Sequence, residues 1–201
     1  MSFLYTPTLE RLDFLFHRIT KDTAVLDVGC GGAGSCIPLE YQPVGKTIAA
    51  RAGSYVGVEP DPKKAAPLAA LGLVVMQKPI EVLTEADRFD VVIAGLVMMY
   101  TKDVNAALRA AHASLKHGGV IVCDVPNVWY ASRILKYLAS GRYGMMDDVH
   151  NNYVFDRASL AKLFQENGFV VTEERFIRGR IREKLYPRRF SEFIGIVAEK
   201  R

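Results

Sequence analysis

The sequence predicts an α/β fold: a seven-stranded, mostly parallel sheet with helices on both faces and an antiparallel hairpin at the C-terminal end. Three observations lead to this prediction. Short, continuously apolar segments alternate with stretches of helical periodicity, as expected of parallel strands buried on both faces. A glycine-rich turn follows the first of these segments. The last two apolar segments lie close together, which favours a hairpin.

The elements follow in order along the chain. The N-terminal part, residues 1–21, is expected to form a helix over about 8–20, because Leu9, Leu12 and Phe16 recur at helical spacing. Two more helices are expected at about 103–117, ended by Gly118-Gly119, and at about 156–167. Strands are expected at 23–28, 54–59, 72–76, 89–94, 119–124, 169–177 and 190–198. Together these elements describe a Rossmann-like sheet.

Composition is that of an ordinary globular protein. Of 201 residues, 50% are hydrophobic and 24% charged, and no linker divides the chain, so residues 1–201 are expected to form a single domain. The longest apolar run, 91–100, is too short to span a bilayer. Three cysteines without CxxC spacing indicate neither a disulfide framework nor a zinc site. We therefore expect a cytoplasmic protein with no metal and no integral membrane contact.

Positive charge is concentrated near the C-terminus. Nine Lys and Arg face three Asp and Glu from Arg175 onwards, whereas residues 1–174 carry seventeen basic and nineteen acidic side chains. Arg178, Arg180, Arg182 and Lys184 alternate and would share one face if the segment were extended. Such a face could hold phosphate, carboxylate, nucleic acid or an anionic membrane surface. A solvated connection between two strands is the plainer interpretation.

The most informative motif is the run VLDVGCGGAG at residues 25–34. Its Gly29, Gly31 and Gly34 satisfy GxGxxG directly after a strand, where glycine lets the backbone turn sharply and approach a ligand. The next strand ends in Glu59, and an acid at that place can accept hydrogen bonds from both ribose hydroxyls. The pair indicates an adenosine-containing cofactor; the alternative is a tight turn with no ligand.

Asp27, just before the glycines, helps to choose the cofactor. A carboxylate there would repel the pyrophosphate of NAD, but it favours the cationic ammonium and sulfonium groups of S-adenosylmethionine. The chain also resembles the class I S-adenosylmethionine-dependent methyltransferases over about residues 22–198. The resemblance rests on LDVGCG at 26–31, VGVEPD at 56–61, FDVVIA at 89–94 and LKHGGVIV at 115–122.

The resemblance implies roles for individual residues in holding S-adenosylmethionine. Gly29 and Gly31 would lie behind its methionine part, Asp27 near its ammonium group and Glu59 at its ribose. Ile80 would lie near the adenine. The full set of implied cofactor contacts is Asp27, Gly29, Cys30, Gly31, Gly34, Glu59, Ile80 and Ala94.

Two features depart from the family pattern. The stretch 77–80 lacks the small polar or acidic residue that many members place at the adenine amino group. Between Gly31 and Glu59, residues Pro38, Pro43 and Gly45 interrupt the expected first crossover helix. Residues 35–53 therefore form either a surface insertion or an added wall of the substrate site.

Residues 126–156 follow the carboxyl end of the fifth strand and are rich in aromatic and polar groups, so they are expected to be a substrate or lid segment. Their pattern is similar to that of a subgroup that methylates sugars, cell-envelope intermediates and quinone-type molecules. His150 is the candidate general base, or else a residue that orients the loop. The candidate substrate contacts are Tyr100, Asn127, Trp129, Tyr130 and Tyr153.

The expected function is S-adenosylmethionine-dependent O-methylation of a small-molecule or sugar-type acceptor, which can be anionic. RNA methylation is an alternative suggested by the basic C-terminal segment, although no Asn/Asp-Pro-Pro-aromatic motif is present. A non-catalytic binding module with this fold is a second alternative, and an NAD-dependent dehydrogenase a more distant one.

Overall fold

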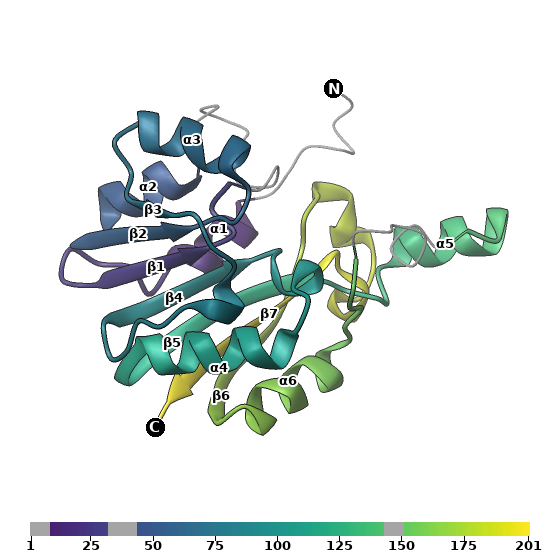
Figure 1. Ribbon diagram of the computed structural model, residues 1–201. Helices are drawn as coiled ribbons and strands as arrows, with labels where there is room; N and C mark the ends of the chain where they lie inside the picture. Colours follow the sequence, from purple (N-terminus) through teal and green to yellow (C-terminus); the bar gives the residue numbers. More distant parts are fainter. Residues whose placement is uncertain (1–8, 32–43, 143–150) are drawn as a thin grey trace.

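A computed structural model describes residues 9–31, 44–142 and 151–201, which contain one seven-stranded sheet of order β3-β2-β1-β4-β5-β7-β6 (Figure 1). Strands β1 to β5 are parallel to one another. Strand β7 is antiparallel to both β5 and β6. The predicted fold class, with its antiparallel C-terminal hairpin, is confirmed. The strands are β1 (Ala24–Val28), β2 (Ser54–Val58), β3 (Val75–Met76), β4 (Phe89–Gly95), β5 (Leu115–Pro126), β6 (Phe169–Ile177) and β7 (Phe193–Lys200).

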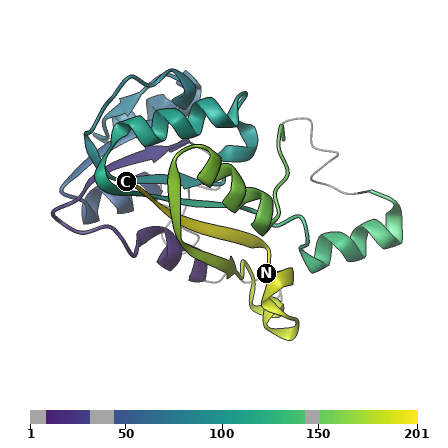
Figure 2. The ribbon, with the colours of Figure 1, turned by 90° about the horizontal axis from the view of Figure 1, so that it is seen from below.

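Helices cover both faces of the sheet, as Figure 2 shows edge-on. Leu26 and Val92 point into one hydrophobic cluster with α4 and α6, whereas Val25 and Ile93 point into the other with α1 and α2. This alternation is the two-residue period of a strand buried on both sides. The helices are α1 (Glu10–Phe16), α2 (Val44–Arg51), α3 (Pro62–Ala70), α4 (Val104–Ser114), α5 (Ala131–Ser140) and α6 (Arg157–Glu166).

Short 3₁₀ turns complete the chain: η2 (Ile80–Val82), η3 (Met98–Tyr100), η4 (Ile181–Leu185) and η5 (Arg188–Phe190). In the described parts of the chain, no helix is long and apolar enough to cross a membrane.

Side-chain caps explain where three helices begin. The carboxylates of Asp61 and Asp103 accept hydrogen bonds from backbone N–H groups at the starts of α3 and α4. Asp156 forms a reciprocal capping box with Ser159 at the start of α6. Helix α4 ends at Ser114, earlier than predicted, because the fully buried Leu115 already pairs with Phe89 as the first residue of β5.

The basic connection between β6 and β7 is not extended, so its alternating cations do not share one strand-like face. Strand β6 ends at Ile177, and η4 and η5 follow. The carboxylate of the buried Glu183 organises this connection by accepting hydrogen bonds from the backbone N–H groups of Gly179 (3.3 Å) and Glu192 (2.9 Å). A buried acceptor that needs partners favours a compact turn over an exposed strand.

Candidate functional site

A cleft of about 910 Å³ opens at the carboxyl ends of β1, β2 and β4. Ligands of open α/β sheets bind at this edge. The lining comes from six parts of the chain: Arg11 and Leu15 of α1; Asp27 to Cys30; Val44; Val58 to Pro60 and Lys64; Pro79 to Val82; and Ile93 and Gly95 to Val97 together with Tyr100 to Asp103.

The glycine turn at the end of β1 forms the floor of the cleft. Gly29 adopts φ +72°, and a Cβ there would lie 2.7 Å from Cγ2 of Val97. A Cβ on Gly31 would lie 2.8 Å from Oε2 of Glu59 and 2.7 Å from Cβ of Lys64. Both positions therefore require glycine. The third predicted glycine, Gly34, lies outside the described residues.

Glu59 is buried at the end of β2, with its carboxylate held by backbone donors. The N–H of Gly31 donates to Oε2 (3.2 Å) and that of Asp61 to Oε1 (3.0 Å). A carboxylate has further acceptor sites beyond these two bonds. Glu59 can therefore still accept hydrogen bonds from two neighbouring hydroxyls in the cleft.

Asp27 is buried beside it and accepts a hydrogen bond from the Tyr55 hydroxyl (2.9 Å). Burial raises the pKa of Asp27 to about 7, although the Tyr55 hydrogen bond opposes this shift. Burial, reinforced by the charges of Asp27 and Glu59, also raises the pKa of the Cys30 thiol to about 12, so Cys30 is not a thiolate nucleophile.

Helix α2 lies in the region where the sequence predicts an interrupted helix. Gly45 does not break this helix; it belongs to the first turn, and a Cβ there would collide with the hydroxyl of Tyr55. Glycine therefore lets α2 pack closely against the Asp27–Tyr55 pair. Ile48 of this helix and Ala52, which follows it, are buried in the core. Of the predicted insertion 35–53, the part that is described packs on the sheet, and Val44 reaches the cleft wall.

Two further predicted cofactor residues differ in position. Ile80 in η2 lines the cleft. Ala94 does not: it is fully buried in the core, and its neighbours Ile93 and Gly95 line the cleft. Because side chains alternate along a strand, an offset of one residue moves the contact to the other face.

Tyr100 bounds another side of the cleft. The segment that follows His150 is held against this rim: the backbone N–H of Asn152 donates to the Met99 carbonyl (2.8 Å), and its side-chain amide donates to the Thr101 carbonyl (2.9 Å). The Tyr153 hydroxyl donates to the Lys102 carbonyl (3.1 Å). His150 itself lies outside the described residues.

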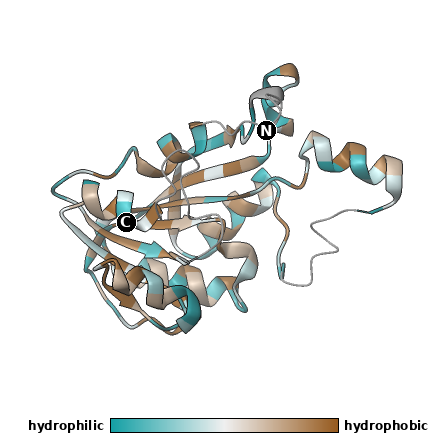
Figure 3. Ribbon diagram, turned by 90° about the horizontal axis from the view of Figure 1, so that it is seen from above, coloured by the Kyte–Doolittle hydropathy of each residue, from teal (hydrophilic) through white to brown (hydrophobic). Residues whose placement is uncertain are grey.

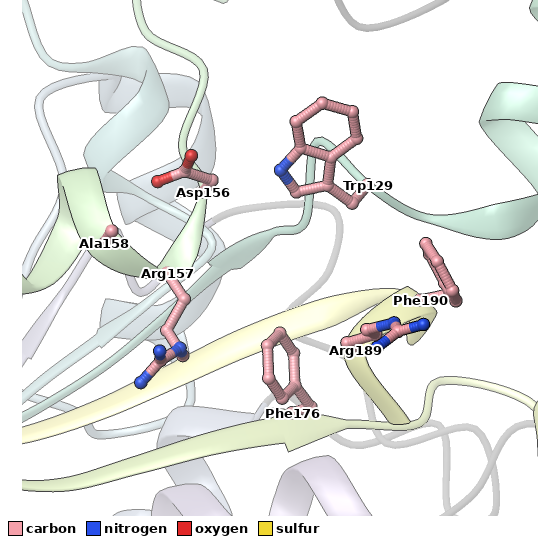
Figure 4. A pocket seen from close by; sticks show the side chains of 7 residues that line it. All are labelled: Trp129, Asp156, Arg157, Ala158, Phe176, Arg189 and Phe190. Carbon is pink, nitrogen blue, oxygen red and sulfur yellow. The ribbon is translucent and has the colours of Figure 1, made fainter. Parts of the chain in front are cut away.

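Of the five predicted substrate residues, Tyr100 lines this cleft, whereas Asn127, Trp129, Tyr130 and Tyr153 do not. The Asn127 amide donates to the carbonyls of Arg189 (2.9 Å) and Ser191 (3.0 Å), and its oxygen accepts from the Trp129 N–H (3.0 Å), so its polar atoms hold the loop together. Tyr130 is buried at the base of α5. Trp129 lines a separate hollow of about 410 Å³ with Asp156, Arg157, Ala158, Phe176, Arg189 and Phe190 (Figure 4).

The comparisons with known proteins agree with this geometry. The family model described as a methyltransferase domain matches residues 3–174. The chain belongs to this methyltransferase family. The match confirms the expected class of enzyme, an S-adenosylmethionine-dependent methyltransferase, and its cofactor. A comparison with curated proteins finds no match.

Solved methyltransferase structures share the fold. A chain of the complex between the Haloferax volcanii Trm112 methyltransferase activator and a methyltransferase has a TM-score of 0.71 at 17% identity, over 94% of this chain and 87% of that one. An S-adenosylmethionine-dependent methyltransferase from Thermotoga maritima has a TM-score of 0.68 at 19% identity, over 99% and 90%. The Burkholderia thailandensis 1,6-didemethyltoxoflavin-N1-methyltransferase, solved with S-adenosylhomocysteine bound, has a TM-score of 0.60 at 17% identity, over 89% and 71%.

The methyltransferase cleft also contains a residue that the sequence analysis missed. Arg11 of α1 lines the cleft and pairs with Asp124 of β5, which is fully buried; Nη2 and Oδ1 lie 3.1 Å apart. The same Oδ1 accepts the N–H of Leu96 (3.1 Å). The sequence could have indicated Asp124, because it ends an apolar predicted strand. It could not indicate the partner, because Arg11 lies 113 positions away.

Proposed function

We propose that this methyltransferase methylates a hydroxyl oxygen of a small-molecule or sugar-type acceptor bound beside Tyr100. One observation carries the proposal: the glycine turn, two buried carboxylates and the Tyr100 rim all line one cleft of about 910 Å³. A cleft of this size can take a cofactor together with a small acceptor.

The residues on the donor side suit S-adenosylmethionine. Gly29 and Gly31 leave the backbone open to close approach, and Cys30 lies between them. Glu59 would accept hydrogen bonds from the two ribose hydroxyls. Ile80 would pack on the adenine, and Asp27 would face the ammonium group. When bound, the cofactor supplies an electrophilic methyl carbon on a sulfonium.

On the acceptor side, His150 would take the hydroxyl proton as the oxygen attacks the methyl carbon and the carbon–sulfur bond breaks. Two observations support this role. The chain has four histidines, and the other three, His17, His112 and His117, do not line the cleft. The residues that directly follow His150 are hydrogen-bonded to the rim at Met99 and Thr101. Holding the acceptor in line with the methyl group would supply much of the remaining rate.

RNA methylation has less support from the basic segment than the sequence suggested. Arg188 pairs with Glu10 (2.6 Å), and Arg180 pairs with Glu192 (3.5 Å), so part of the charge is used within the protein. The rim of the cleft carries both signs, with Lys102 beside Asp103 and Glu81. A continuous positive track for a polynucleotide is therefore not favoured there.

The first test measures the cofactor. Calorimetric titrations with S-adenosylmethionine, S-adenosylhomocysteine and NAD should give binding for the first two and none for NAD. Tight NAD binding would contradict the proposal. Methyl transfer from labelled S-adenosylmethionine to panels of alcohols, sugars, amines, carboxylates and RNA then identifies the acceptor; labelling confined to amines, carboxylates or RNA would contradict O-methylation.

The second test locates the acceptor. Hydrogen exchange with S-adenosylhomocysteine and the acceptor together should protect residues 126–156, with an added effect in 35–53 if that region forms a wall. Protection on the opposite face of the sheet alone would place the acceptor elsewhere.

The buried free thiols Cys30 and Cys123 suit a reducing compartment, which is why we place the enzyme in the cytoplasm.

A further inference from the structure

Helix α5 projects away from the rest of the molecule, as two perpendicular views show (Figures 1 and 2). None of its ten residues is buried. Leu135 is 66% exposed and Leu138 is 74% exposed. Leucines on a helix normally face a core, so an apolar helix surface left in solvent indicates a binding surface.

Four apolar residues form one stripe along α5, and two of them, Leu135 and Leu138, are exposed. Ala131, Ile134, Leu135 and Leu138 follow one another at spacings of three, one and three residues, which places them on one side of a helix. Ser132, Lys136 and Ser140 fall on the other side, and Figure 3 shows the two kinds of residue along the helix. The charged side chains from Asn127 to Arg142 are all cationic.

The base of α5 is attached firmly to the body. Tyr130, just before the helix, is buried, and the Arg133 guanidinium lies 5.1 Å from the centre of its ring. Arg133 also donates to the Asn127 carbonyl (3.3 Å), and Asn127 is bonded to the segment before β7. The apolar stripe is therefore presented in a direction that the body determines.

A second surface of the same character lies beside this base. In the η4–η5 connection, Leu185 is 83% exposed, and Lys184 and Arg189 are exposed on either side of it. The Arg189 carbonyl accepts a hydrogen bond from the Asn127 side-chain amide, and this bond joins the connection to the base of α5. Trp129 is 56% exposed and shares the hollow of Figure 4 with Arg189.

We propose that α5 and the η4–η5 connection dock the enzyme onto the surface of an anionic lipid bilayer. Leu135, Leu138 and Leu185 would enter the boundary between headgroups and acyl chains, while Lys136 and Lys184 contact anionic headgroups. Trp129 is amphipathic and suits the interface. A second copy of the chain fits less well, because pairing α5 with α5 would bring Arg133 and Lys136 of one copy close to those of the other.

The experiment uses the intact protein and its own reporter, since Trp129 is the single tryptophan of the chain. The protein should sediment with vesicles of phosphatidylglycerol and phosphatidylcholine in equal parts, and these vesicles should shift Trp129 emission to shorter wavelength. Vesicles of phosphatidylcholine alone should do so far less, and added salt should weaken binding to the anionic vesicles. Equal binding to both kinds of vesicle, or binding to neither, would overturn the proposal.

Variants then locate the contact. Leu135→Asp combined with Leu138→Asp should lower vesicle affinity at least about tenfold, because the two leucines that would enter the bilayer are lost. Lys136→Ser should lower it about fivefold. The matched control is Val74→Asp: Val74 is 60% exposed, next to β3 at the opposite edge of the sheet. Unchanged thermal unfolding would show that the variants fold.

Two results from these variants would count against the bilayer. One is an affinity loss as large in Val74→Asp as in the α5 variant. The other is a concentration-dependent dimer, measured by light scattering without lipid, that the α5 variant dissociates; this would assign the surface to self-association.

Discussion

The donor side and the acceptor side of the molecule are built differently. On the donor side, Asp27 and Glu59 are buried and hydrogen-bonded, and Gly29 and Gly31 leave no room for a side chain. On the proposed acceptor side, the segment after β5 is packed less tightly: Trp129 lines a hollow separate from the cleft, and no residue of α5 is buried. A ligand that is the same for a whole family can be met by a tightly packed site, whereas the part that meets a particular acceptor can vary on loops beyond the strands.

The largest expected effect tests the packed donor side. Gly31→Val should abolish binding of S-adenosylhomocysteine, because even the first carbon of the new side chain would collide with Glu59 and Lys64. Calorimetry measures the loss, and circular dichroism checks that the variant folds. Binding within a few-fold of the wild type would show that this turn has more room than the geometry allows.

His150→Ala addresses the acceptor side. If the acceptor is a hydroxyl and His150 its base, the single-turnover rate of methyl transfer should fall by roughly 10²–10⁴ while cofactor affinity stays nearly the same. The matched control is His117→Ala, since His117 is exposed on β5 and away from the cleft. A variant that keeps its rate but binds acceptor weakly would make His150 a positioning residue, and an amine or carboxylate acceptor would need no base.

Glu59→Ala returns to the donor side with a graded change. Loss of the acceptor for two ribose hydroxyls should cost roughly 2–4 kcal/mol of cofactor affinity. Glu85→Ala is the control, because Glu85 forms a surface ion pair with Arg88 (2.7 Å) outside the cleft. Equal affinity for wild type and Glu59→Ala would move the ribose site away from β2.

The smallest expected effect is a pH dependence. In the free protein the pKa of Asp27 is about 7, so lowering the pH from about 8 to about 6 should weaken cofactor binding about tenfold, as the carboxylate that faces the ammonium group is neutralised. Asp27→Asn should remove this dependence. Tyr55→Phe should move it to higher pH, because the Tyr55 hydrogen bond holds the pKa down.

The stability of the free protein should show the opposite trend. Folded Asp27 keeps its proton to about pH 7, whereas the unfolded chain releases it near pH 3.8, so the folded state binds more protons between these values. The Asp27 contribution therefore destabilises the protein progressively as pH rises through this interval and is constant above it. Urea unfolding of the wild type and Asp27→Asn across this interval measures the difference; identical pH profiles would contradict it.

Sequence patterns placed the glycine turn and Glu59 at the same end of the sheet because their signals are local. The glycines at 29 and 31 follow a strand directly, and Glu59 ends the next one, so chain order alone brings them together. Ala94 was placed one residue away from the cleft lining because periodicity fixes a strand more reliably than the face of each residue. The role of Gly45 was missed, since the reason for glycine is a hydroxyl on another element, that of Tyr55.

The acceptor side depends on contacts between distant parts of the chain. Arg11 meets Asp124, and the Asn127 amide meets the carbonyl of Arg189, across 113 and 62 positions. An asparagine after a strand can serve a ligand or a loop equally well, and only the folded chain shows which. The basic connection likewise turns compactly because of Glu183, whose burial no local pattern indicates.

The place of β7 in the sheet has a consequence for how the protein is made. This strand is the last of the sheet to be synthesised, yet it lies between β5 and β6 and buries Ile194, Ile196 and Val197 completely. While a ribosome still holds β7, the long edge of β5 has no partner, and β6 has nothing to pair with. Pairing at such separations in sequence is slow, and unpaired strand edges aggregate. Nascent chains of this enzyme should therefore depend on chaperones until β7 emerges.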